Sequence, residues 1–148
     1  MRRIWAATAL FLSSFGALAA DEVFVADSAA IRGYDPVAYF TEGRPVKGEP
    51  QFRHEWNGAT WHFASRENLE RFSADPGRYA PQFGGFCAFG VSRGYKVGTD
   101  PDAFTVHDGK LYLNYSLPVQ ATWLQDTDAY IGKGRANWEK LEHEPYEP

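Results

Sequence analysis

The chain has 148 residues, a formal net charge of −4 and one cysteine. Phosphate contacts need concentrated positive charge, and no cluster of Lys or Arg is present, so a nucleic-acid partner is excluded. The length suits one domain with a hydrophobic core.

The first twenty residues have the pattern of a secretory signal. Arg2 and Arg3 precede an apolar stretch over 4–12, and the small-x-small pattern of a peptidase site falls at 17–19. The apolar stretch is too short for a stable membrane span. We therefore expect a cleaved signal over 1–20, and a single periplasmic domain over 21–148 with no stable membrane span after cleavage.

The first elements of that domain are a short strand and a short helix. We expect the strand over 23–26. Asp35 is typical of a helix cap and Pro36 of a first helical position. The helix is expected to end near Gly43.

A β-hairpin is predicted over 51–56 and 59–64, because Asn-Gly at 57–58 is the dipeptide best suited to a two-residue turn. This register places Phe52 opposite Phe63. One face then collects the residues of a buried side, namely Phe52, His54, Trp56, Trp61 and Phe63.

A second hairpin is predicted over 103–107 and 110–115, around Asp-Gly at 108–109. Its expected core face is apolar and consists of Phe104, Val106, Leu111 and Leu113. Its expected solvent face consists of Thr105, His107, Lys110, Tyr112 and Asn114.

Helices are expected between and after the hairpins. Ser65 begins a helix that ends at the Asp-Pro-Gly break over 75–77. A short helix follows Gly84 and Gly85 and runs through Cys87 to Val91, and two terminal helices are expected over 116–125 and 128–141. The predicted class is α+β, with antiparallel β-hairpins packed against several short helices.

Several of these segments resemble the YHS domain. The matching blocks are Gly33-Tyr-Asp-Pro-Val-Ala-Tyr-Phe40, Trp61-His-Phe-Ala-Ser65, Asn68-Leu-Glu-Arg-Phe72 and Asp75-Pro-Gly-Arg-Tyr79. The stretches over 79–87 and 108–115 resemble its exported, single-domain bacterial branch. The resemblance implies a YHS-like α+β fold.

The same resemblance implies a link to metal handling, because YHS domains accompany copper-transporting ATPases. In the metal-associated versions, cysteines stand where this chain has Ala38, Ala64 and Asn68. A metal role therefore does not transfer to this chain through those three thiols.

Cys87 is the main candidate for chemistry, and three interpretations stay open. It is a small buried hydrophobe, a thiolate that ligates a metal or contacts a cofactor, or a redox or nucleophilic thiol. No His or Asp lies at a spacing that identifies a catalytic partner, which argues against an enzyme.

Further candidates are expected to line a ligand pocket beside Cys87. They are Tyr34, Asp35, Tyr39, Gly84, Gly85, Tyr112 and Asn114. The alternative for Asp35 and the two tyrosines is structural, with Asp35 capping its helix. For a metal, copper or another transition metal, the expected ligands are Cys87 and Asp35.

We therefore expect a non-enzymatic periplasmic binding or accessory protein for a metal ion or small ligand, most plausibly in copper handling through Cys87. One alternative is a thiol-dependent redox protein or enzyme that uses Cys87. The other is a structural domain whose aromatic surface binds another periplasmic protein.

Overall fold

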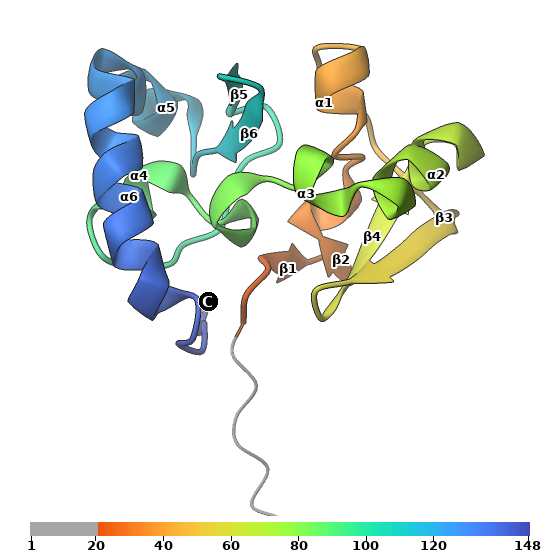
Figure 1. Cartoon of the computed structure of the whole chain (residues 1–148), viewed down its shortest axis with the longest axis horizontal. Helices are drawn as coiled ribbons and strands as arrows, with labels where there is room; N and C mark the ends of the chain where they lie inside the picture. The colour runs from red at the N-terminus through yellow and green to blue at the C-terminus, as the bar shows by residue number, and fades with distance from the viewer. Residues whose placement is uncertain (1–20) are drawn as a thin grey trace, which may run out of the picture.

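The computed structural model describes residues 21–148, so the expected signal lies outside the described residues. Two groups of elements lie side by side in Figure 1. The first group comprises β1 (Val25–Ala26), β2 (Ala29–Ala30), η1 (Ile31–Gly33), α1 (Ala38–Thr41), β3 (Glu49–Trp56), β4 (Ala59–Phe63), α2 (Arg66–Ala74) and α3 (Pro76–Tyr79). The second comprises η2 (Gln82–Gly85), α4 (Ala88–Ser92), β5 (Phe104–His107), β6 (Lys110–Leu113), α5 (Leu117–Trp123), η3 (Leu124–Asp126) and α6 (Thr127–Leu141).

The strands form three separate antiparallel pairs, β1–β2, β3–β4 and β5–β6. Short helices cover them, which confirms the α+β class. Each group of elements has its own cluster of buried side chains. Trp61, Phe63 and Phe72 lie in the first cluster. Phe86 and Trp123 lie in the second.

The first hairpin turns at Asn57-Gly58 as predicted, and both residues adopt positive φ. Trp56 pairs with Ala59, but the register slips further along the strands. Phe63 faces Glu49 instead of Phe52, because β3 carries an irregularity between Glu49 and Arg53. The predicted pairing of Phe52 with Phe63 is therefore wrong, although Trp61 and Phe63 are buried as expected.

The expected solvent face of the second hairpin is partly buried in the structure. Leu111 and Leu113 pack in the first cluster, whereas Tyr112 between them packs in the second. Strand β6 thus lies between the two clusters and is buried on both faces. Tyr112 and Asn114 are buried instead of solvated, and Val106 on the expected core face is 41% exposed.

Capping serines fix two helix starts at the predicted places. Ser65 Oγ accepts a hydrogen bond from the Asn68 backbone N–H at 3.1 Å, and Ser116 Oγ accepts one from Val119 at 3.3 Å. Helix α2 ends at Ala74, directly before the predicted break over 75–77. A second short helix, α3, then begins at Pro76.

The two halves are joined where the N-terminal segment crosses η2. Phe24 N–H donates to the Gly84 carbonyl at 2.9 Å. A Cβ at position 84 would lie 1.8 Å from the Glu22 carbonyl oxygen, and φ there is +63°. Only glycine permits this close approach of two backbones.

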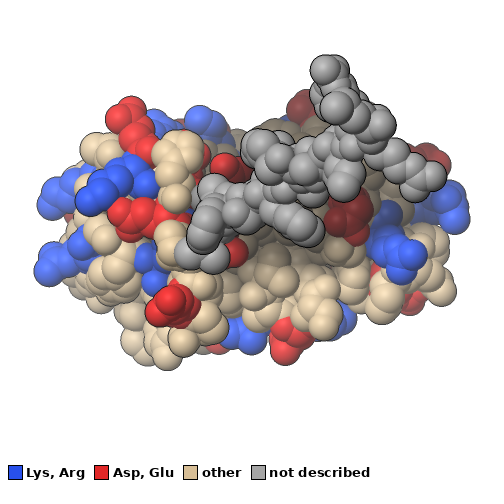
Figure 2. Space-filling model, turned by 90° about the horizontal axis from the view of Figure 1, so that it is seen from below, with Lys and Arg blue, Asp and Glu red and all other residues tan. Residues whose placement is uncertain are grey.

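Within the described part of the chain, no helix is both long and apolar enough to span a bilayer. On the face in Figure 2, acidic and basic side chains are interspersed, with no large area of one sign.

Candidate functional site

Cys87 caps the N-terminus of α4 and holds its sulfur among three polar groups. Its Sγ accepts hydrogen bonds from the backbone N–H groups of Gly90 at 3.4 Å and Tyr115 at 3.2 Å. The thiol donates to Asn114 Oδ1 at 3.5 Å. The sulfur is therefore fixed in one position by contacts from both α4 and the segment after β6.

Asn114 supports this arrangement from a fully buried position. Its Oδ1 also accepts from the Phe89 backbone N–H at 3.1 Å. Its Nδ2 has no hydrogen-bond partner among residues 21–148. A buried donor without a partner carries a desolvation cost, so a water or ligand acceptor beside it would be stabilising.

A small pocket of about 220 Å³ adjoins Cys87, and we call it the Cys87 pocket. Its other lining residues are apolar or aromatic: Phe89, Tyr95, Val97, Tyr115 and Val119. Tyr95 and Tyr115 are 50% and 57% exposed and stand at the rim, whereas Cys87 is 1% exposed and lies at the base. The thiol thus borders an open apolar hollow while remaining shielded from bulk water.

Burial raises the pKa of the Cys87 thiol, although hydrogen bonds from the backbone of Gly90, Tyr115 and Phe89 act in the opposite direction. The thiol is therefore neutral at pH 7. None of the six residues that line the Cys87 pocket is a His, Lys, Arg, Asp or Glu that could serve as a base. This environment is unlike that of a nucleophilic cysteine, which needs an electropositive setting or a nearby base.

Asp35 lies elsewhere, fully buried in the first group of elements. Its carboxylate accepts four hydrogen bonds, from Val37 N–H (2.8 Å), Ala38 N–H (3.3 Å), Ala64 N–H (2.8 Å) and Asn68 Nδ2 (2.8 Å). These bonds tie the start of α1 to the end of β4 and to α2. Helix α1 begins at Ala38 with Val37 as its N-cap residue, so the expected positions of Asp35 as cap and Pro36 as first helical residue are wrong. Asp35 still has a structural role, and it does not line the Cys87 pocket.

The hydrogen bonds of Asp35 also involve the three positions at which metal-associated YHS domains have cysteines. Ala38, Ala64 and Asn68, which replace the family's thiols, all contact the Asp35 carboxylate. The three positions do converge in space, as ligands of one ion must. In this chain they surround a carboxylate already saturated by N–H donors, so these residues do not fit a metal ion.

The two tyrosines beside Asp35 are also outside the Cys87 pocket. Tyr39 donates its hydroxyl to the Pro101 carbonyl at 2.8 Å, and burial raises its pKa. Tyr34 presents its ring to Lys47 Nζ, which lies 5.0 Å from the ring centroid. Both tyrosines therefore have structural contacts.

The remaining predicted residues are likewise structural. Tyr112 packs between Phe83 and Trp123, with ring centroids 6.1 and 5.2 Å away. Gly84 permits the backbone crossing, and the Gly85 carbonyl accepts from Thr99 Oγ1 at 2.8 Å. Of the eight predicted ligand-binding residues, only Cys87 lines the Cys87 pocket. Asn114 contacts the Cys87 sulfur but is not among the lining residues.

The other pocket residues were not anticipated. Their backbones lie on α4, on the loop after it and at the start of α5, and only folding brings them together. One sequence feature could have indicated Tyr95 and Tyr115, because each is a large aromatic residue outside the helices and strands.

A separate group of possible metal ligands lies at the surface, at the tip of the β5–β6 hairpin. His107 Nε2 is 2.9 Å from Asp128 Oδ1 and 3.4 Å from Asp108 Oδ2. Both carboxylates are strongly exposed, and Lys110 and Arg135 line the same hollow. Two cations beside the cluster oppose binding of a metal ion, and a surface ion pair accounts for the contacts.

Residues 37–83 match the family model of the YHS domain. The matched segment is about a third of the chain, and over these residues the chain is similar to a YHS domain. The match confirms the resemblance over residues 37–83, and the family is one linked to metal handling. No curated protein and no solved structure matches the chain in the other two comparisons.

The YHS segment ends in η2, four residues before Cys87 (87 − 83). It contains the first hairpin and the three residues at 38, 64 and 68 that contact Asp35, which itself lies two residues before the segment. The Cys87 pocket belongs to the part of the chain that follows the matched segment.

Proposed function

We propose that this YHS protein is an exported accessory protein of the periplasm that binds a small ligand in the Cys87 pocket. The ligand is soft and weakly polar, in keeping with the pocket's apolar walls and single thiol. A soft metal ion such as Cu(I) is the member of this class that the family's link to metal handling favours.

The observation that carries the proposal is the position of the Cys87 sulfur. It adjoins an open hollow, and contacts from Gly90, Tyr115 and Asn114 hold it still. A cysteine that serves only as a small hydrophobe needs neither the hollow nor three polar contacts. The unpartnered Asn114 Nδ2 adds a donor close to the same sulfur.

For Cu(I), Cys87 fits as one ligand and no more. The six residues around the pocket include no His, Met or carboxylate that could add a second. The second ligand must therefore come from outside the chain, either a small thiol or a side chain of another periplasmic protein. The exposed Tyr95 and Tyr115 at the rim are apolar surface on which such a partner can pack.

The neutral thiol favours binding over redox catalysis. The raised pKa keeps the attacking thiolate scarce, and the pocket offers no general base. Because a metal ion must displace the thiol proton, binding should strengthen with pH, by about tenfold per pH unit below the thiol's pKa.

Competition titration with a Cu(I) chelator tests the proposal, in the presence and absence of glutathione as the outside ligand. We expect sub-micromolar binding that needs the small thiol and weakens at least about tenfold in Cys87→Ser. His107→Gln is the control, because it removes the only other group of possible ligands among residues 21–148 and leaves Cys87 intact.

Binding weaker than micromolar in every condition would remove the copper proposal. Binding that is unaffected by Cys87→Ser and lost in His107→Gln would move the site to the surface cluster.

A further inference from the structure

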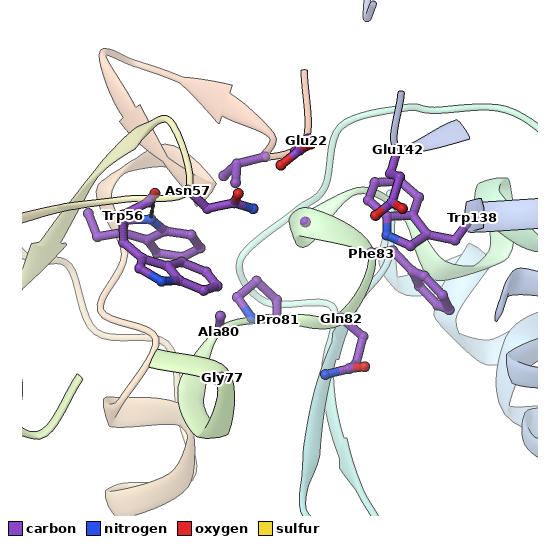
Figure 3. Close-up of a pocket in the computed structure, with 13 residues that line it drawn as sticks. Glu22, Trp56, Asn57, Gly77, Ala80, Pro81, Gln82, Phe83, Trp138 and Glu142 are labelled. Carbon is purple, nitrogen blue, oxygen red and sulfur yellow. Dashed lines mark hydrogen bonds between the residues drawn. The ribbon is translucent and has the colours of Figure 1, made fainter. Parts of the chain in front are cut away.

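A second hollow of about 230 Å³ lies where the two halves of the molecule meet (Figure 3). We call it the tryptophan pocket. Trp56 and Asn57 stand on one side of it, and Phe83, Trp138 and Glu142 on the other. Ala80, Pro81 and Gln82 run between the two sides, and Glu22 lies above them.

The aromatic residues of this pocket are held firmly. Trp61, which also lines it, donates its indole N–H to the Trp56 carbonyl at 3.0 Å, and the two rings are 5.9 Å apart. Trp138 packs against Phe83 with centroids 6.0 Å apart. Rigid aromatic walls of this kind favour binding because little side-chain entropy is lost when a ligand arrives.

The charge of the lining has one sign. Glu22 and Glu142 are the charged residues among those that line the pocket in the described chain, and no Lys, Arg or His accompanies them there. Carboxylates near indole faces attract cations, because each aromatic face carries the negative part of the ring quadrupole.

One ammonium group, that of Lys96, already lies beside this region without lining the pocket. Its Nζ lies 5.3 Å from the Trp138 ring centroid and 5.1 Å from that of Phe86. Burial lowers the pKa of Lys96, while Asp21, Glu144, Glu22 and Glu142 act to raise it. Glu142 also has His143 as a neighbour, with Nε2 3.3 Å from its Oε1. Lys96 and His143 together are two groups beside four carboxylates, so negative charge remains in excess around the pocket.

We propose that the tryptophan pocket binds a small organic ammonium ion. The tryptophan faces contact its alkyl groups, and Glu22 and Glu142 supply the opposing charge. The volume lies below the roughly 300–1,000 Å³ of pockets for drug-sized ligands, so the ligand is the size of choline or smaller.

Titration of the purified chain with choline, followed by calorimetry and tryptophan fluorescence at constant ionic strength, tests this site. The matched neutral probe is 3,3-dimethylbutan-1-ol, which has the same shape and no charge. We expect choline to bind at least about tenfold more tightly than the alcohol, because the alcohol lacks the charge that both the indole faces and the carboxylates attract.

The double variant Glu22→Gln/Glu142→Gln should weaken choline binding by about tenfold and leave binding of the alcohol unchanged. Glu139→Gln makes the same charge change at an exposed position on α6 outside the pocket and should have no effect. Cys87→Ser should also bind choline normally, which separates this site from the Cys87 pocket. Equal affinity for choline and the alcohol, no binding of choline up to about 10 mM, or an unchanged affinity in the double variant would overturn the proposal.

Discussion

Asp35, just before the matched YHS segment, shows how one side chain ties together several parts of that segment. Four N–H donors converge on its carboxylate, from residues up to 33 positions away in the chain. The buried charge is compensated only while all four donors point at oxygen.

Asp35→Asn should therefore destabilise the protein by about 3 kcal/mol, because the new NH2 group must face donors that then lose their acceptor. Urea unfolding measures the change. Asp108→Asn, at a position that is 86% exposed, is the control and should stay within about 0.5 kcal/mol of wild type. A cost no larger than that of the control would show that the Asp35 carboxylate has no structural role.

The thiol of Cys87 should ionise only at alkaline pH. Burial raises its pKa, so the rate of alkylation by iodoacetamide should rise with pH through a midpoint above the ordinary value of about 8.5. Cys87→Ser is the blank. A midpoint below pH 8 would favour the reactive-thiol alternative instead.

The same shift links Cys87 to stability. The unfolded chain releases the thiol proton at the ordinary pKa and the folded chain at a higher one. The stabilisation is thus complete below about pH 8.5 and is lost as the pH rises above it.

Helix α6 carries two glycines in different surroundings. Gly132 has open space around its Cα, whereas a Cβ at Gly134 would lie 2.8 Å from Phe83 Cζ. Glycine lowers helix propensity at both positions, but Gly134 also allows the helix to approach Phe83.

Gly132→Ala should stabilise the protein by up to about 1 kcal/mol, because alanine favours the helix. Gly134→Ala should destabilise it by about 1–3 kcal/mol, because the methyl group collides with the ring. Thermal unfolding of the two variants measures this difference in sign. Two shifts in the same direction would contradict the packing of α6 against η2.

Strand β6 explains why the site was only partly predictable. Its alternation of Lys110, Leu111, Tyr112 and Leu113 was interpreted as one buried and one solvated face. The polar atoms of Tyr112 and Asn114 supported that interpretation. A sequence does not show that helices cover the second face, nor that the start of α4 lies against Asn114 and brings it to Cys87.

At the scale of the whole molecule, local signals predicted most of the elements. The turn dipeptides at 57–58 and 108–109 and the capping residues Ser65 and Ser116 act within a few residues, so the sequence carries them directly. The Cys87 pocket instead depends on contacts between segments about 27 positions apart, such as Cys87 with Asn114. Spacing alone does not encode such contacts.

The family match and the single thiol lie in different halves of the molecule. The YHS segment keeps the arrangement of three positions around Asp35 but holds no thiol there. The single thiol lies in the other half, beside its own pocket. A metal-handling role in this chain therefore depends on Cys87.

Residue-resolved NMR of the ¹⁵N-labelled protein during addition of Cu(I) with glutathione is the most direct test of that dependence, because Cu(I) is diamagnetic. The amide protons of Gly90 and Tyr115 donate to the Cys87 sulfur, so their signals should shift first and furthest. An unchanged spectrum, or shifts confined to His107 and Asp128, would contradict a ligand site at Cys87.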